Sequence, residues 1–233
     1  MLGLPTPADG TVLVVASDLH LGSMLGRRWA TARAAQFSEL RPDLILLVGD
    51  IFEGEKETHA AWIPVLQQFR APRGVFAVTG NHEFYAQPEP ILDAFRQAGF
   101  RVLRDEHVEA LPGLIVAGVD DPAFRKKGRR DQAIAMDQAF ANRPNGATIF
   151  LSHTPVLEER AAQMGAGLML SGHTHNGQIW PFQYFVRIAF RLVTGRYDVN
   201  GMTAIVGRGT GTWGPRMRLW KRSEIVRITL RSA

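Results

Sequence analysis

Short apolar runs alternate with longer amphipathic stretches through the first 170 residues. Runs of aliphatic residues without internal polar positions are typical of strands buried on both faces of a sheet. Such runs predict strands at 11–16, 44–48, 75–78, 148–151 and 168–170. The stretches between them predict helices at 27–40, 58–69, 88–98 and 131–141, and Pro64 should delay or kink the second helix. Strands that alternate with helices indicate a largely parallel sheet.

The remaining strand signals extend that sheet, and the later hairpins among them predict antiparallel additions. Residues 100–119 predict three short strands, and the alternation at 225–230 predicts a closing strand. Asn200-Gly201 lies between two apolar segments and is a strong signal for a hairpin turn. We see no repeat and no linker. We therefore expect one domain over residues 1–233, with an α/β fold in which mixed sheets carry helices on both outer faces.

The composition excludes cysteine chemistry and bears on where in the cell the protein is located. The 233 residues contain no cysteine, which excludes disulfides and thiolate-bound metals. The net charge of +5 permits anionic partners without requiring one. The sequence contains no run of 18 apolar residues, so we predict no membrane-spanning helix. The first residues also lack the features of a signal peptide. As the sequence stands, we expect a cytoplasmic or peripheral membrane protein, or an extracytoplasmic one if an N-terminal signal or membrane segment has been removed.

Polar residues that can bind metal follow the predicted strands. These residues are Asp18, His20, Asp50, Asn81, His82, His153, His173 and His175. The carboxyl ends of parallel strands converge on one crevice, where ligands bind. We therefore expect all eight residues to lie together. Only two of the seven histidines, His59 and His107, fall outside this pattern, and we expect both to be surface or structural.

The number of donors indicates more than one metal ion. Asp, Asn and His side chains suit manganese, iron or zinc. The set exceeds what one ion needs, whereas two ions roughly 3.5–4 Å apart would use all of it and could clamp both oxygens of a phosphoryl displacement. A carboxylate would bridge the two ions, and Asp50 is the natural candidate.

In order and spacing, these residues resemble the five motifs of the calcineurin-like metallophosphoesterases. The motifs are Asp18-x-His20, Gly49-Asp50, Gly80-Asn81-His82-Glu83, His153 and Gly172-His173-Thr174-His175. The segments 172–182 and 208–215 further resemble the YkuE-like bacterial branch, except that Asn176 stands where the family usually has Gly. Asn tolerates positive φ, so the turn can survive. The resemblance implies a four-layer α/β/β/α sandwich with two mixed β-sheets.

The resemblance also implies a role for each residue. The first metal would be held by Asp18, His20 and His175, the second by Asn81, His153 and His173, with Asp50 bridging them. Manganese is the first choice, with zinc or iron as alternatives. A metal-bound hydroxide would attack phosphorus, and His82 would protonate the leaving oxygen or stabilise charge on it. The family often places a carboxylate at the position of Glu53, so we expect Glu53 to orient His82. We expect Glu83 to brace the loop.

Segment 181–193 supplies a clue to the substrate. Its apolar residues recur with helical spacing on one face: Phe182, Phe185, Val186, Ala189, Phe190 and Val193. Such a helix could pack on the core or lie in a membrane interface. Either arrangement puts an apolar wall beside the metals, so Phe182 and Phe185 are candidate substrate contacts. Arg208 is a candidate contact for the substrate phosphate. The basic cluster 125–130 suggests a solvated loop or, alternatively, a contact with an anionic membrane or substrate.

Taken together, the sequence predicts a dinuclear-metal phosphoesterase that hydrolyses a phosphomonoester, phosphodiester or pyrophosphate. An amphipathic or lipid-linked substrate is favoured, and a peripheral membrane contact is a secondary expectation. One alternative is a nucleotide or nucleic-acid phosphodiesterase, although no aromatic platform interleaved with basic residues is evident and no nucleic-acid partner is expected. The other is a non-catalytic, metal-stabilised scaffold. No obligate protein partner is evident.

Overall fold

The computed structural model describes residues 1, 3–22, 24–53, 59–85, 87–122 and 132–232. Its first sheet has five strands, which run in the order β13 (Val226–Thr229), β1 (Val12–Ala16), β3 (Leu44–Val48), β5 (Val75–Val78) and β6 (Phe100–Val102). All neighbours in this sheet are parallel except β13, which pairs antiparallel with β1. The closing strand predicted from the alternation at 225–230 therefore completes the first sheet at one edge.

The second sheet has six strands. Their order is β11 (Gly195–Val199), β12 (Met202–Val206), β10 (Ala166–Ser171), β9 (Ala147–Leu151), β8 (Leu114–Gly118) and β7 (Glu106–Leu111). The inner four strands are parallel, and β11 and β7 are antiparallel edges. The predicted hairpin joins β11 to β12, and both Asn200 and Gly201 have the positive φ that a type I′ turn requires. The prediction of mixed sheets is confirmed.

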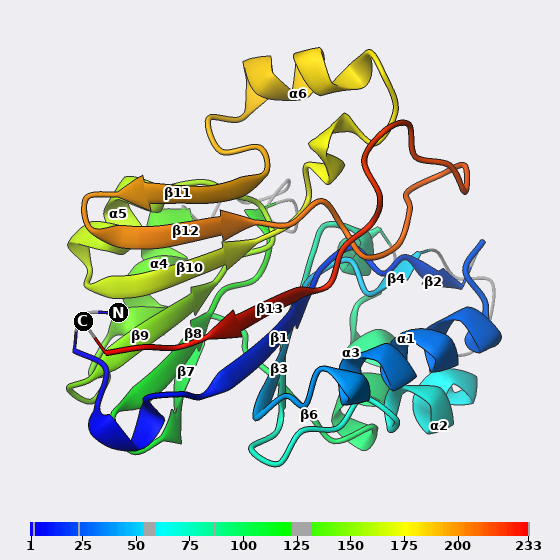
Figure 1. Cartoon of the computed structure of the whole chain (residues 1–233). Helices are drawn as coiled ribbons and strands as arrows, with labels where there is room; N and C mark the ends of the chain where they lie inside the picture. Colours follow the sequence, from blue (N-terminus) through cyan, green and yellow to red (C-terminus); the bar gives the residue numbers. More distant parts are fainter. Residues whose placement is uncertain (2, 23, 54–58, 86, 123–131, 233) are drawn as a thin grey trace.

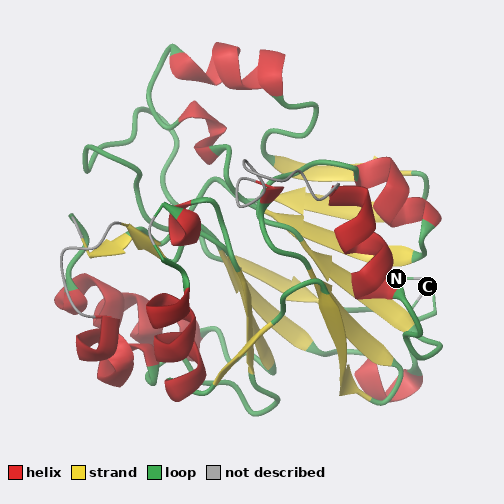
Figure 2. Cartoon of the chain, turned by 180° about the vertical axis from the view of Figure 1, so that it is seen from behind, coloured by secondary structure: helices red, strands yellow, loops and turns green. Residues whose placement is uncertain are grey.

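The two sheets pack face to face, with helices on both outer faces (Figures 1 and 2). Alternation along each strand explains this layering, because successive side chains point to opposite faces. In β1, Leu13 and Val15 enter the core between the sheets, whereas Val14 packs under the helices of the first sheet. In β9, Ile149 enters the same inter-sheet core and Phe150 faces the opposite helical layer. The result is the predicted four-layer α/β/β/α sandwich.

The outer helices differ from the prediction mainly in their ends. The first sheet is covered by α1 (Arg27–Glu39), α2 (Ile63–Leu66) and α3 (Glu89–Gln97), and the second by α4 (Gln132–Phe140) and α5 (Glu158–Gln163). The helix expected at 58–69 is instead a 3₁₀ turn, His59–Trp62, followed by the single turn of α2. Pro64 lies in the first turn of α2, which fits the expected late start.

Two further elements lie near the carboxyl ends of the strands. A small parallel sheet joins β2 (Leu21–Gly22) to β4 (Phe52–Glu53). Helix α6 (Phe182–Ala189) stands clear of both sheets and has no buried residue (Figure 1). It is shorter than the predicted 181–193, because Phe190 already has extended backbone angles. The basic cluster 125–130 lies outside the described residues.

Candidate metal centre

The eight polar residues singled out in the sequence lie at the carboxyl ends of strands from both sheets. Asp18 and His20 follow β1, Asp50 follows β3, and Asn81 and His82 follow β5. From the second sheet, His153 follows β9, and His173 and His175 follow β10. Seven of the eight are buried, and His173 is partly exposed. The facing sheets therefore bring two separate sets of donors into one crevice.

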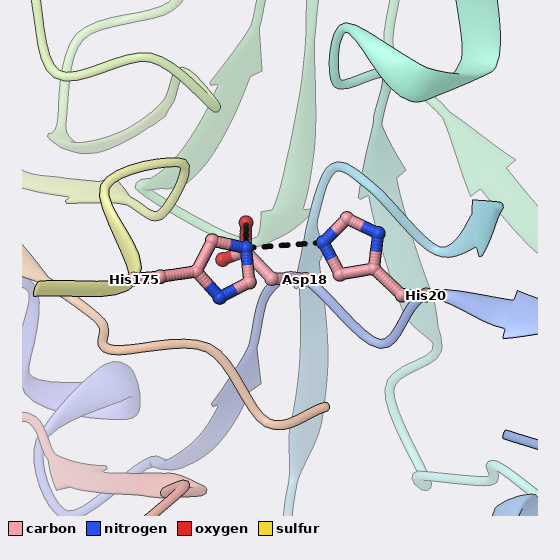
Figure 3. A group of neighbouring side chains, drawn as sticks. All are labelled: Asp18, His20 and His175. Carbon is pink, nitrogen blue, oxygen red and sulfur yellow. Dashed lines mark hydrogen bonds and ion pairs between the residues drawn. The ribbon is translucent and has the colours of Figure 1, made fainter. Parts of the chain in front are cut away.

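One cluster consists of Asp18, His20 and His175, with their donor atoms close enough to share an ion. The Nε2 atoms of His20 and His175 are 3.1 Å apart, and Nε2 of His175 is 3.2 Å from Oδ1 of Asp18 (Figure 3). Two imidazole nitrogens and a carboxylate oxygen thus converge on one point from β1 and β10. This geometry suits a single divalent cation.

A second cluster consists of Asp50, His153 and His173, and Asn81 adjoins it. Nε2 of His153 is 3.1 Å from Oδ2 of Asp50, and Nδ1 of His173 is 2.8 Å from Oδ1 of Asn81. The same Oδ2 atom of Asp50 lies 3.9 Å from Nε2 of His20 in the first cluster. Asp50 therefore stands between the clusters, where a bridging ligand would stand.

The surroundings of His153 show whether these residues suit a metal ion. Its Nδ1 lies 2.8 Å from the carbonyl oxygen of Val48 and donates to it, which turns Nε2 toward Asp50. That buried Nε2 makes no well-aligned hydrogen bond among the described residues, although Oδ2 of Asp50 lies only 3.1 Å away. Burial lowers the pKa of His153, but Asp50 and Asp18 outweigh burial and raise it well above its usual range. Positive charge between these groups is therefore favoured, and a bound metal ion would supply it.

The backbone at the ligands is unusual. Asp18, His20, Asp50, His173 and His175 all have φ between 46° and 69°. This left-handed region costs a non-glycine residue on the order of 1–3 kcal/mol and is concentrated at functional sites. Because His173 and His175 both turn in this way, their imidazoles do not point together as they would on an extended strand, and each joins a different cluster. Asn176, where the family usually has Gly, also has positive φ.

Two glycines let the chain approach the ligands. A Cβ atom at Gly80 would overlap the carboxylate of Asp50, and one at Gly172 would overlap Ser17 and Asp18. Neither glycine has the positive φ that would also require glycine. Close contact with candidate metal ligands, rather than backbone conformation, therefore explains these two motif positions.

Glu83 holds the loops that carry Asp50 and Asn81. Its buried carboxylate accepts hydrogen bonds from the backbone N–H groups of Asp50, Ile51, Phe52 and Gly80, at 2.7–3.1 Å. Burial and the charge of Asp50 raise the pKa of Glu83 to about 7, whereas the backbone donors oppose that rise. Glu83 therefore contacts the backbone of the ligand loops and braces them.

Glu53 does not take the position expected for it. Its Oε2 lies 3.2 Å from Nδ1 of His20, although neither this atom nor the buried Nδ1 of His82 makes a well-aligned hydrogen bond among the described residues. The acidic group still lies near both rings, because donor atoms of Glu53, His20 and His82 are within 4.8 Å of one another. Glu53 thus contacts His20 where a pairing with His82 was expected, and a carboxylate behind a candidate ligand is the arrangement that orients many metal-binding histidines.

A cleft of about 480 Å³ opens over the clusters. Its floor includes Asp50, His82 and His173, and its walls are apolar and aromatic. The wall residues are Tyr85, Ile179, Phe182, Val186, Phe190, Trp213 and Pro215. Phe182 lines the cleft, but Phe185 does not and is exposed instead. Arg208 does not line the cleft either, because its guanidinium lies 3.4 Å from Glu224.

Sequence reasoning missed three residues at this site. Tyr85 accepts a hydrogen bond from the side chain of Asn81, and Gln178 joins the segment after His175 to the loop at Trp213. Arg218 donates to the carbonyl oxygens of Gly209 and Gly211 and lies 3.2 Å from Nδ1 of His175. Gln178 lies within the segment that resembles the YkuE-like branch. Tyr85 and Arg218 reach the site from irregular segments, and the hydrophobic pattern of the sequence does not predict the conformation of such segments.

Comparisons with known proteins agree with this geometry. Residues 11–177 match the family model described as calcineurin-like phosphoesterase. An uncharacterized metallophosphoesterase of Aquifex aeolicus is 34% identical, over 93% of this chain and 83% of its own length. The uncharacterized metallophosphoesterase YkuE of Bacillus subtilis is 28% identical, over 98% of this chain and 82% of its own. Several other curated relatives are longer, and the chain spans only 55–61% of their length.

Among solved structures, the 5′-nucleotidase precursor of Thermus thermophilus is similar in fold. Its TM-score is 0.57 at 17% sequence identity, with 94% of this chain and 54% of that chain covered. The matched family region contains Asp18 through His175 and so includes both clusters. The chain therefore belongs to the calcineurin-like phosphoesterases, and the family is one of metal-dependent hydrolases with a dinuclear centre.

Proposed function

We propose that this chain is a dinuclear-metal phosphoesterase that hydrolyses an amphipathic phosphoester or pyrophosphate, with a lipid-linked substrate as the favoured class. One observation carries the proposal: metal-binding side chains and an apolar wall line the same cleft. The volume of about 480 Å³ is within the range of small-molecule sites. A polar phosphoryl group would lie on the floor, and the apolar part of the substrate would lie against the wall.

The ligand assignment follows the two clusters. We assign Asp18, His20 and His175 to the first ion and Asn81, His153 and His173 to the second, with Asp50 shared. Manganese is the first ion to test, followed by zinc and iron, because Asp, Asn and His accept all three. When bound, two such ions lower the pKa of water and neutralise charge on the phosphoryl oxygens.

His82 is the candidate that acts on the leaving oxygen. It lines the cleft, and its Nε2 lies 3.9 Å from Oδ2 of Asp50. Burial lowers the pKa of His82, although Asp50 opposes that shift. A neutral imidazole near pH 7 can donate a hydrogen bond to the leaving oxygen. Stabilisation of negative charge through that N–H is therefore favoured over transfer of a full proton.

The apolar wall is what selects the substrate in this proposal. Phe182, Val186 and Phe190 lie four residues apart and all face the cleft. The ring of Phe190 also lies 5.3 Å from that of His173, edge to face, so the wall begins beside a metal ligand. Each methylene group buried there would add about 0.8 kcal/mol to binding.

A matched pair of substrates tests the proposal. The p-nitrophenyl phosphodiesters with a methyl and an octyl group are compared, below micellar concentration, after chelation and return of manganese, zinc or iron. We expect kcat/KM to be at least about tenfold higher for the octyl ester. Val186→Asn should reduce this preference, whereas Ile188→Asn, on the same helix but outside the cleft, should keep it. Equal values for the two esters would remove the amphipathic substrate.

The nucleotide phosphodiesterase is the second candidate. Tyr85 and Trp213 bring aromatic rings to the cleft, and such rings can stack on a base. Cyclic nucleotides and single-stranded DNA belong in the same assay, without detergent. If the chain hydrolyses cyclic nucleotides or single-stranded DNA faster than the octyl ester, a nucleotide phosphodiesterase is favoured over an enzyme for lipid-linked substrates.

A further inference from the structure

Exposed apolar side chains are concentrated around the mouth of the cleft. They come from α6, from Trp180 two residues before it and from the loop 213–220. Among the described residues, Ile188 is 85% exposed and Trp220 is 73% exposed, with Phe185, Trp213 and Met217 each more than half exposed. Figure 1 shows α6 at one extremity of the molecule, away from both termini. We call residues 180–188 and 213–222 the aromatic rim.

The two segments of the aromatic rim form one surface. The rings of Trp180 and Trp220 meet edge to face with centroids 6.5 Å apart. The side chain of Gln178 accepts a hydrogen bond from the backbone N–H of Trp213 and donates one to its carbonyl oxygen. The backbone N–H of Leu219 donates to the carbonyl oxygen of Gln178. These interactions hold the loop beside the start of α6, so the exposed side chains project from a defined scaffold.

The charge around the aromatic rim has one sign. Between residues 178 and 222 the only acidic residue is Asp198, whereas the rim itself carries Arg187, Arg216, Arg218, Lys221 and Arg222. Among the described residues, Arg187, Arg216, Lys221 and Arg222 have no acidic partner. These four basic residues are therefore available to an anionic partner.

We propose that the aromatic rim binds the surface of an anionic lipid bilayer. Tryptophan and tyrosine combine an apolar body with a polar tip and favour the boundary between lipid and water. The four basic residues complement anionic headgroups. In a symmetric dimer through this face, each copy would set the same positive charges against those of its partner. Among the described residues, no helix is both long and apolar enough to cross a bilayer.

The position of Phe182 connects this surface to the reaction. Phe182 lines the cleft and is also 60% exposed, so the rim is the mouth of the cleft. On a bilayer, that mouth would face the headgroups, and a lipid-linked phosphoester could enter without leaving the membrane. This consequence for turnover rests on the proposed function, whereas bilayer binding does not.

Flotation of the full chain with liposomes tests the binding. Vesicles of phosphatidylcholine alone are compared with vesicles that also contain phosphatidylglycerol. We expect binding to the anionic vesicles that weakens with salt, and Arg187→Gln plus Lys221→Gln should weaken it about 30-fold. Ile188→Asp plus Trp220→Asp should abolish it. Ile134→Asp, at a half-exposed site on α4, is the matched control and should bind as the parent does.

Two outcomes would overturn bilayer binding. One is absence of binding to both kinds of vesicle, and the other is binding that Ile188→Asp plus Trp220→Asp leaves unchanged. Analytical ultracentrifugation of the same variants tests the alternative that a second copy of this chain covers the aromatic rim. If the parent is a dimer and the variants are monomers, the rim is an interface between copies. All variants should keep their hydrolysis of bis-p-nitrophenyl phosphate, so failure to bind vesicles stays distinct from failure of the proposed chemistry.

Discussion

The side-chain amide of Asn81 donates a hydrogen bond to the hydroxyl oxygen of Tyr85, over 2.8 Å. The two residues lie at either end of the 3₁₀ turn His82–Phe84. Because the amide nitrogen is held by Tyr85, Oδ1 of Asn81 turns toward His173 and the second cluster. Tyr85 also packs its ring 4.5 Å from that of His82. One exposed tyrosine thus contacts both a candidate metal ligand and the candidate catalytic histidine.

The first prediction concerns this tyrosine. Tyr85→Phe removes the hydroxyl but keeps the ring beside His82. We expect the affinity of the second ion to fall about three- to tenfold, the value of one hydrogen bond, with little change in the free energy of unfolding. Manganese titration by calorimetry measures the effect. Tyr184→Phe, on α6, is the control, and equal affinities for both variants would show that Tyr85 does not orient Asn81.

The second prediction concerns Glu83. Glu83→Ala leaves four buried backbone N–H groups without their acceptor, which should cost at least about 3 kcal/mol of the free energy of unfolding. Glu83→Gln should be less harmful, because one oxygen remains to accept. Urea unfolding of the metal-free protein measures both. Glu39→Gln, at an exposed site on α1, should cost less than about 0.5 kcal/mol. A small loss for Glu83→Ala would mean that water replaces the carboxylate.

The location of the site could be predicted from the sequence, but several side-chain contacts could not. Buried strands followed by Asp, Asn or His were enough to bring Asp18 and Asp50 to one edge, since the parallel strands β1 and β3 end together. The partner of Glu53 depends on the short β2–β4 pair, which has no sequence signal and places the carboxylate at His20. Phe185 was chosen as a contact by helical spacing alone, whereas the cleft lies on the side of Val186.

The third prediction separates Glu53 from His82. If Glu53 orients His20, Glu53→Gln should weaken binding of the first ion about tenfold or more, whatever the leaving group of the substrate. His82→Ala should keep both ions and lose most activity on esters with poor leaving groups. Elemental analysis and a leaving-group series with substituted phenyl phosphodiesters give the two readouts. If Glu53→Gln and His82→Ala change the dependence of rate on the leaving group equally, Glu53 acts through His82, as the sequence predicted.

The final prediction is that metal affinity rises with pH. In the metal-free protein, burial lowers the pKa of His153, but Asp50 and Asp18 raise it well above the usual range. Burial likewise raises the pKa of Asp50, but His153 outweighs burial and lowers it to about 2. At neutral pH, His153 is therefore protonated beside ionised Asp50. A metal ion must displace that proton, so affinity should fall about tenfold per pH unit below the raised pKa for each such histidine.

The stability of the protein should also depend on pH, and the sign of that dependence should differ between the metal-free and the metal-bound protein. The ion pair of protonated His153 with Asp50 stabilises the metal-free protein, and that contribution is lost as pH rises through the raised pKa. Stabilisation by metal grows over the same range, because it depends on the ratio of metal concentration to Kd. Melting temperatures with manganese and with chelator should therefore diverge as pH rises above about 6.5, the usual pKa of histidine. His107→Gln should preserve this divergence, since His107 contacts the carbonyl oxygen of Ala139 away from the clusters, and His153→Asn should reduce it. Parallel melting curves for the parent protein would show that His153 carries no proton for the metal to displace.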